Sequence, residues 1–246
     1  MLLEKNVLPK SLENLVNILT DALNLYGKIT PKLAKKLVVK ANVQVKDMMR
    51  YAAFDHPTVD CYGRKLVYED DHFEVMVMSW NPRDYSSIHN HGHTEWGVVQ
   101  VFGNTHHLVY QLKGNELSFA KKEILPKGAA IKVNNAFIHQ MGNATTEPYL
   151  TLHVYGSNHA QKAITADAKN FDLELDRIAH TSGGAFFNLP DEKIYDIEEG
   201  VEPTREVFMQ YAYLLMDYYN RQELTDEIAG LKRDLLKKME TVVISN

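Results

Sequence analysis

Apolar residues recur at intervals of three or four positions in the first fifty residues, which is the spacing of one face of an α-helix. The first such run occupies Leu12, Leu15, Val16, Leu19, Ala22, Leu23 and Tyr26. Thr30 followed by Pro31 combines a capping hydroxyl with a first-turn proline and favours the start of a second helix. The apolar side of that helix carries Leu33 and Leu37. We therefore expect two amphipathic helices in this region.

From Arg64 the pattern changes to short runs that are rich in β-branched and aromatic residues, as β-strands are. The runs are RKLVYE, HFEVMVMSW, WGVVQVF, THHLVYQL, ELSFAKKE, AAIKV and YLTLHVYG. Turn-forming pairs such as Gly103-Asn104 and Gly114-Asn115 separate most of them. This succession of short strands predicts a mainly β fold, either a sandwich or a barrel.

The C-terminal part of the chain has a different pattern. The segment from about Asp167 to Val201 shows no clear period and contains Gly183-Gly184, so we expect an extended loop with local structure. After it, Thr204 and Thr225 each precede a run with helical spacing. The apolar positions of these runs are Val207, Phe208, Tyr211, Leu214, Leu215 and Tyr218, then Ile228, Leu231, Leu235 and Met239. We expect a helical pair that packs on the β-rich part or mediates self-association with a partner chain.

The length of 246 residues exceeds the usual domain size but is ordinary for one β-rich core with helical additions. We therefore expect one main domain with three parts. These are an N-terminal helical region packed on the barrel (1–60), a barrel core (61–160) and a loop-rich and helical C-terminal extension (161–246).

Composition narrows the class of protein further. Hydrophobic residues make up 45% and charged residues 24% of the chain, as in globular rather than disordered proteins. The net charge of -5 gives no electrostatic reason to expect nucleic acid, so small molecules are the expected partners. A single cysteine, Cys61, excludes an internal disulfide and suits a reducing compartment.

The first residues give no indication of a signal peptide or a membrane span. Charged side chains at Glu4, Lys5, Lys10 and Glu13 interrupt every apolar stretch there. We therefore expect a cytoplasmic protein without a membrane partner.

The stretch SSIHNHGHTEWGVV carries the strongest chemical signal in the chain. Side chains two residues apart share one face of a strand, so His89 and His91 can offer two imidazole nitrogens to one metal ion. His139, about fifty residues later, is a candidate for the third ligand. Imidazole ligands suit iron, zinc, copper or nickel, so this spacing does not select the metal.

The segment around His139 resembles the second motif of the cupin superfamily, in which a glycine precedes the histidine and an asparagine follows it. Here these residues are Gly128 and Asn143. The turn between them departs from the motif, since Asn134 and Ala136 occupy the places where proline and glycine are usual. The resemblance implies a cupin-type jelly-roll barrel.

Other histidines and one glutamate nearby leave alternatives open. His93 and Glu95 have the same parity as the two histidines, but a bulge after His91 would turn them away. His106 and His107 are adjacent and face opposite sides of a strand, so we interpret both as hydrogen-bonded core or surface residues.

Several motifs together resemble a cysteine dioxygenase, the thiol dioxygenase branch of the cupins. They are YAAFD from Tyr51, YGRKLV from Tyr62, MVMSW ending at Trp80, SSIHNH, Gly103, His139, and LTLHVYG from Leu150. The likeness covers about Tyr51 to Tyr155, extends to the helices before it, and ends near Ala160.

The resemblance implies a ligand set and a substrate pocket. His89, His91 and His139 would hold one ferrous iron, Fe(II), per chain. Arg64 stands where the family binds the substrate carboxylate, with Tyr62 beside it. His153 and Tyr155 stand where a histidine and a tyrosine line the iron pocket, in a hydrogen-bonded chain that begins here at Thr151.

Two further positions refine what the resemblance implies. Mammalian members carry a cysteine, cross-linked to the pocket tyrosine, where this chain has Trp96-Gly97, so no cross-link is expected. Relatives that prefer mercaptopropionate carry glutamine at the position of Arg64, which favours cysteine as the substrate here.

The chemistry of these residue types agrees with that assignment. Three neutral imidazoles leave the full charge on a divalent metal, which attracts a thiolate and lowers its pKa. A guanidinium such as that of Arg64 binds a carboxylate through two parallel hydrogen bonds. We therefore expect an iron-dependent thiol dioxygenase that oxidises cysteine, or a close carboxylated thiol, with dioxygen to its sulfinic acid.

Two other functions remain open from the sequence. In the first, Glu95 is a fourth metal ligand and the substrate is not a thiol, because a bound carboxylate weakens the attraction for a thiolate. In the second, the protein is a non-catalytic, cupin-like ligand sensor whose C-terminal helices transmit ligand binding to a partner.

Overall fold

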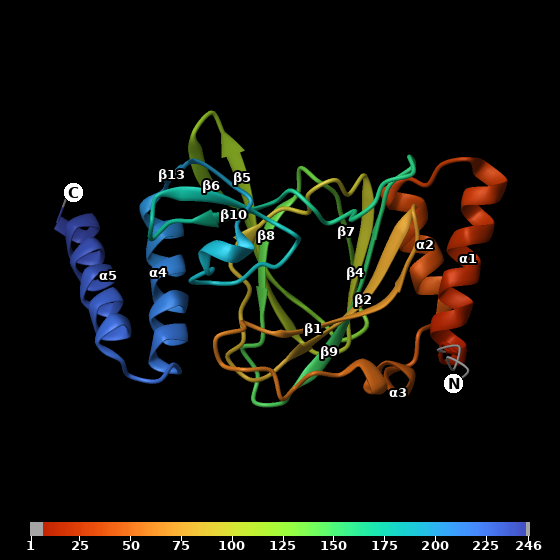
Figure 1. The fold of residues 1–246 in the computed structure, drawn as a ribbon, viewed down its shortest axis with the longest axis horizontal. Helices are drawn as coiled ribbons and strands as arrows, with labels where there is room; N and C mark the ends of the chain where they lie inside the picture. The colour runs from red at the N-terminus through yellow and green to blue at the C-terminus, as the bar shows by residue number, and fades with distance from the viewer. Residues whose placement is uncertain (1–6, 245–246) are drawn as a thin grey trace.

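Figure 1 shows the computed structural model, which describes residues 7–244 as two β-sheets with helices at both ends of the molecule. The two predicted N-terminal helices are confirmed as α1 (Lys10–Tyr26) and α2 (Pro31–Ala41). The hydroxyl of Thr30 caps α2 by accepting a hydrogen bond from the amide of Leu33. A short helix, α3 (Val45–Met48), and a 3-10 turn, η1 (Met49–Tyr51), lead into the sheets.

The strands form one five-stranded and one eight-stranded sheet. In spatial order, the first sheet contains β1 (Gly63–Glu69), β2 (Phe73–Trp80), β9 (Tyr149–Gly156), β4 (Trp96–Val101) and β7 (Ala130–Val133). The second contains β12 (Asp196–Glu199), β11 (Arg177–Thr181), β10 (Ala168–Asp172), β3 (Ile88–His89), β8 (Ile138–Gly142), β5 (Thr105–Lys113), β6 (Glu116–Leu125) and β13 (Glu202–Pro203). The predicted mainly β, cupin-type architecture with terminal helices is therefore confirmed.

The three central strands of the first sheet, β2, β9 and β4, are buried on both faces, and this determines which side chains reach the interior. On β2, Val75 and Val77 pack under the N-terminal helices, whereas Met76 and Met78 join the core between the sheets. The same alternation on β9 sends Leu152 toward the helices. It sends Thr151, His153 and Tyr155, which have the opposite parity, toward the interior.

The prediction of an extended loop between Asp167 and Val201 is wrong. This segment supplies β10, β11 and β12, together with the 3-10 turn η2 (Asp191–Lys193). Phe171 and Asn170 of β10 pair directly with Ile88 and His89 of β3. The strand sequences AKNFD, RIAHT and DIEE lack a clean alternation, so their own pattern does not indicate strands. Pairing with β3 positions β10, and β11 and β12 add to it in turn.

The predicted C-terminal helices are confirmed as α4 (Arg205–Asn220) and α5 (Asp226–Ile244). Helix α4 lies against β6 and β13, and α5 packs on the outer side of α4 (Figure 1). Arg221, just after α4, donates a hydrogen bond of 3.0 Å to the buried carboxylate of Asp84 and ties the extension to the barrel. Within residues 7–244, no helix combines the length and apolar character needed to cross a membrane.

Candidate metal centre and substrate pocket

Three buried or half-buried histidines converge between the sheets. His89 ends β3, His91 lies just before the turn at Gly92, and His139 lies on β8 directly opposite His89. One nitrogen from each ring lies within 4.8 Å of the other two. The Nε2 atoms of His91 and His139 are 3.1 Å apart. The structure thus brings together the three residues that the sequence singled out as ligands.

The outer nitrogen of each ring has its own hydrogen-bond partner. Nδ1 of His89 is 2.9 Å from the carbonyl of Ser87, and Nδ1 of His91 is 3.1 Å from the carbonyl of Asn134. A carbonyl only accepts, so both rings carry their hydrogen on Nδ1 and leave Nε2 free. Histidines that bind metals are oriented by hydrogen bonds of this kind.

Burial keeps these imidazoles neutral. It lowers the pKa of His89 to about 4 and the pKa of His91 and His139 well below the usual value, because a charged ring loses its hydration inside the protein. Neutral imidazoles with inward nitrogens are the form that a divalent metal requires.

The third ligand candidate is held by another histidine. Nδ1 of His139 is 3.0 Å from Nε2 of His107, and Nδ1 of His107 is 3.1 Å from a carboxylate oxygen of Glu123. If Nε2 of His139 is free for a metal, its Nδ1–H donates to His107, whose own Nδ1–H then donates to Glu123. The sequence indicated that His107 is a hydrogen-bonded core or surface residue; it lies in the core, and the sequence did not reveal this partner.

Glu95 and His93 do not join this group. A turn with a positive φ at Gly92 follows His91, and the amide of Thr94 bonds to the carbonyl of His91. The carboxylate of Glu95 then accepts a 2.7 Å hydrogen bond from the amide of Asn158, and His93 is exposed. The turn directs His93 and Glu95 away from the other histidines, as expected of a bulge after His91. The three-histidine cluster therefore contains no carboxylate.

A hydrogen-bonded chain on β9 ends beside the histidines. The indole N–H of Trp80 donates to the hydroxyl of Thr151 at 2.9 Å, and this hydroxyl lies 2.7 Å from Nε2 of His153. Nδ1 of His153 is 2.7 Å from the hydroxyl of Tyr155.

The directions of these hydrogen bonds follow from the donor at one end. An indole can only donate, so the buried Thr151 hydroxyl satisfies its own hydrogen by donating to His153. His153 then carries its hydrogen on Nδ1 and donates to Tyr155. The hydroxyl hydrogen of Tyr155 is therefore free to donate into the site, and burial keeps it bound by raising the Tyr155 pKa.

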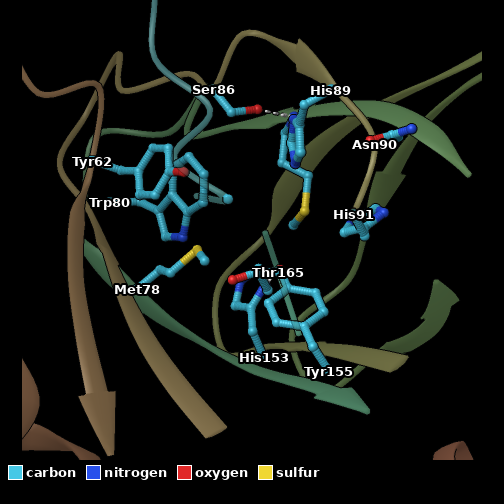
Figure 2. A pocket seen from close by; sticks show the side chains of 12 residues that line it. Tyr62, Met78, Trp80, Ser86, His89, Asn90, His91, His153, Tyr155 and Thr165 are labelled. Atoms are coloured by element: carbon cyan, nitrogen blue, oxygen red, sulfur yellow. Dashed lines mark hydrogen bonds between the residues drawn. The ribbon is translucent and has the colours of Figure 1, made fainter. Parts of the chain in front are cut away.

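Figure 2 shows the inner cavity that these groups line, with Tyr62 and Trp80 on one side and His89 and His91 on the other. The rings of Tyr62 and Trp80 stack with centroids 4.7 Å apart. The Tyr62 hydroxyl accepts a hydrogen bond from the amide of Ala185, and burial raises its pKa to about 12. The enclosed volume is about 10 Å³, which is close to the space of one water molecule.

Arg64 lies in an adjoining outer cavity rather than in the inner one. Tyr62 and Thr165 line both cavities and form the boundary between them. A guanidinium nitrogen of Arg64 is 3.4 Å from the hydroxyl of Thr165. Its buried Nε has no hydrogen-bond partner within the described range 7–244. This is the arrangement of a cation available for an anionic ligand.

The C-terminal extension supplies wall residues that the sequence did not suggest. Thr165 and Gly183 line the inner cavity, and Phe186 packs on Tyr62 with ring centroids 5.0 Å apart. The remaining wall residues outside the predicted set are Met78, Trp80, Ser86, Asn90 and Met141. Met78 and Trp80 lie on one face of β2, which pairs with the strand that carries His153 and Tyr155, so strand alternation could have indicated them. No local pattern indicates Thr165 or Gly183.

The lone cysteine is not part of either cavity. Cys61 is fully buried, and its Sγ accepts a hydrogen bond of 3.1 Å from the amide of Phe187. Burial raises the pKa of this thiol to about 12, so it is not a reactive thiolate.

The family model of cysteine dioxygenase type I matches residues 1–163. The chain belongs to this family. Cysteine dioxygenase type 1 of Danio rerio is 25% identical over 154 residues, which cover 60% of this chain and 75% of that enzyme. The human enzyme of the same name is 28% identical over 111 residues, which cover 43% of this chain and about half, 54%, of that enzyme. Family membership and the histidine cluster imply an enzyme with a non-haem metal.

Similar solved structures include a protein with a double-stranded β-helix domain and a cupin domain. A double-stranded β-helix protein of Klebsiella pneumoniae is 18% identical with a TM-score of 0.36, and the match covers 48% of this chain and 90% of that one. The cupin domain of Cnp3 from Schizosaccharomyces pombe is 8% identical with a TM-score of 0.34, covering 43% of this chain and 67% of that one.

Proposed function

We propose that this protein is an iron-dependent thiol dioxygenase that oxidises cysteine to its sulfinic acid. In the reaction R–SH + O2 → R–SO2H, both oxygen atoms are transferred to sulfur and no other reductant is consumed. The observation that carries the proposal is the convergence of three imidazole nitrogens beside the Tyr155 hydroxyl, with the Arg64 guanidinium in the adjoining cavity.

One ferrous iron per chain would be held by His89, His91 and His139. The donor set fits such an ion, because the three free nitrogens converge and each ring is fixed from behind. When bound, the iron supplies the redox chemistry with dioxygen and the attraction for a thiolate. The neutral ligands leave its charge undiminished, which favours a thiol substrate over the three-histidine, one-glutamate alternative.

Arg64 binds the substrate carboxylate, and Tyr62 packs beside it. A guanidinium with an unpaired, buried Nε gains most from a bidentate partner, so thiols that carry a carboxylate are the expected class. Cysteine is the first choice within that class.

Tyr155 orients the reacting groups by donating its hydroxyl hydrogen into the inner cavity. Thr151 and His153 maintain this direction, since each accepts a hydrogen bond from the residue before it in the series that starts at Trp80 and donates one to the next. A donor fixed in advance stabilises developing negative charge without reorganisation.

The test is an oxygen-uptake screen of the iron-loaded protein with small thiols, with the mass of the product measured. Uptake with cysteine and a product heavier by two oxygen atoms support the proposal. Saturable binding of cysteine without oxygen uptake would instead support the non-catalytic sensor. Four expectations from the sequence stay predictions. They are location in the cytoplasm, self-association through the C-terminal helices, the absence of nucleic-acid and membrane partners, and the three-part division of the chain.

A further inference from the structure

A short segment of the C-terminal extension, residues 163–167, lies directly against the turn at Gly92 beside the proposed metal centre. The contact is close, because a Cβ added at Gly92 would lie 2.0 Å from the carbonyl oxygen of Ala166. In the same way, a Cβ added at Gly183 would lie 2.6 Å from the Cβ of Thr165. Two glycines thus give this segment the space in which it approaches the pocket.

Thr165 is the residue of this segment that contacts Arg64. A guanidinium only donates, so the Thr165 hydroxyl accepts the hydrogen bond of 3.4 Å from Arg64. The hydrogen of this hydroxyl is left for the carboxylate of Glu74 at 3.2 Å or for the carbonyl of Ser182 at 3.3 Å. In the described part of the chain, Thr165 is the one hydrogen-bond partner of the guanidinium. The direction in which Arg64 points therefore depends on Thr165.

Arg64 keeps its charge free of a direct anionic partner. Glu74 is buried and lines the same cavity, yet it contacts Thr165 rather than the guanidinium. Within residues 7–244, the arginines that form ion pairs are Arg83, Arg177 and Arg221. Because the Thr165 hydroxyl bridges Glu74 and Arg64, the cation remains available to a ligand.

Thr165 also connects Arg64 with the inner cavity. Its side chain lines that cavity together with Tyr62 and His153 (Figure 2), while Tyr62 and Thr165 also line the outer one. The guanidinium charge acts across this boundary, since burial lowers the pKa of His153 to about 3 and Arg64 adds to this lowering. A residue that holds Arg64 here determines where a carboxylate is bound relative to the histidines.

We propose that Thr165 is a positioning residue of the reaction, which orients the Arg64 guanidinium so that the substrate carboxylate is bound at the boundary of the inner cavity. This inference rests on the proposed function and adds to it a residue beyond position 163, where the family match ends. Thr165 acts through Arg64, so its effect is confined to substrates that carry a carboxylate.

The experiment compares Thr165→Val, which keeps the shape of the side chain, with Thr165→Ser, which keeps the hydroxyl. Steady-state oxygen uptake of the iron-loaded proteins gives kcat and KM for cysteine and for cysteamine, which has no carboxylate. Anaerobic calorimetry gives the affinity for cysteamine where its turnover is too slow to measure. The valine substitution is also made in an Arg64→Ala background, because a residue that acts only through Arg64 has no further effect there.

We expect Thr165→Val to raise the KM for cysteine by roughly threefold to thirtyfold with a smaller change in kcat, because the carboxylate is bound by a guanidinium that is no longer oriented. Thr165→Ser keeps the wild-type KM, and both variants bind cysteamine as wild type does. In the Arg64→Ala background, the valine substitution leaves kcat/KM for cysteine unchanged.

Three results overturn the inference. They are an unchanged KM for cysteine in Thr165→Val, an equal loss with cysteamine or in Thr165→Ser, and a full loss in the Arg64→Ala background. Each would mean that Thr165 has no effect or acts on the pocket as a whole rather than through Arg64.

The outcome for wild type separates this inference from the proposed function. If wild type oxidises no thiol, the proposed function fails and the inference fails with it. If wild type oxidises cysteine and Thr165→Val behaves like wild type, only the inference fails. Thermal melting and iron content establish that each variant is folded. If Thr165→Val is not folded, Thr165→Ala is judged by the same constants and the same criteria.

Discussion

Nε2 of His107 lies 3.0 Å from Nδ1 of His139, so one of the three proposed metal ligands is positioned by a histidine that is not itself a ligand. The contact crosses from β5 to β8, where Val109 is the register partner of His139 and His107 that of Met141. Glu123 holds the far side of His107 and is in turn bonded by Lys121 at 2.6 Å. The orientation of one ligand thus depends on a carboxylate close to the surface.

We expect His107→Ala to weaken iron binding by about tenfold to a hundredfold, because the free Nδ1 of His139 loses the partner that fixes its ring. Competition with a chelator measures this change. His106→Ala is the matched control, since His106 points to the other face of the strand and bonds to Tyr85. Equal iron affinity in wild type and His107→Ala would contradict a positioning role.

Glu95→Gln is expected to keep its iron, whereas His139→Ala is expected to lose most of it. The carboxylate of Glu95 is committed to the amide of Asn158, while His139 lies inside the cluster. Iron analysis of both purified variants checks this. Loss of iron from a folded Glu95→Gln would favour the four-ligand site, and full occupancy in His139→Ala would exclude the ligand set.

Thr151→Val should reduce kcat by roughly tenfold to a hundredfold with little change in iron content, because the direction of the hydrogen bonds that reach Tyr155 is then no longer fixed. Thr151→Ser keeps the hydroxyl and should keep most of the activity. The comparison needs kcat and iron content for all three proteins. Equal kcat in the valine and serine variants would show that the chain from Trp80 has no role in turnover.

Arg64→Ala is expected to lower kcat/KM for cysteine by roughly tenfold or far more, since an unpaired carboxylate in a closed pocket costs about 2 to 5 kcal/mol. Cysteamine, which has no carboxylate, serves as the control substrate and should lose little. Wild type should also prefer cysteine to cysteamine. Equal use of these two thiols by wild type would show that Arg64 does not select the substrate.

His56 gives the stability of the protein a dependence on pH. Its Nε2 is 3.1 Å from the carboxylate of Asp84, and this hydrogen bond raises the pKa of His56. A raised folded-state pKa means that the stabilisation is fully present below the unfolded value of about 6.5 and is lost as the pH rises through the higher folded value.

Urea unfolding of wild type and His56→Gln at several pH values measures this contribution. The difference in free energy of unfolding between the two proteins should be largest near pH 6 and should shrink toward about pH 9. A difference that stays constant over this range would mean that the imidazolium form of His56 adds no stability.

The parts of this molecule that were predictable from sequence are those that rest on local spacing. Helix capping by Thr30 and Thr204 and the strand pattern of β2 and β9 depend only on residues close together in the chain. The same is true of the pair His89 and His91. The motifs shared with cysteine dioxygenases added His139, Arg64 and Tyr155, which no single segment connects.

The remaining features depend on contacts between segments that are far apart in the chain. Thr165 reaches Arg64 across 101 positions, and the Phe187 amide reaches Cys61 across 126. No periodic pattern in the residues around either position indicates these contacts. Strand β10 follows the same rule, because it is positioned by pairing with the distant β3, and β11 and β12 then add to it in turn.

The pairing of β10 with β3 determines what a shortened form of this protein would be. β3 has only two residues and lies between β10 and β8, so a chain cut after residue 163, where the family match ends, would turn it into an unprotected sheet edge. Its free backbone groups would then invite pairing with other molecules, directly at His89. Loss of β10 would therefore expose the backbone of the strand that ends at a proposed metal ligand, so a truncation there is expected to disturb metal binding together with the sheet edge.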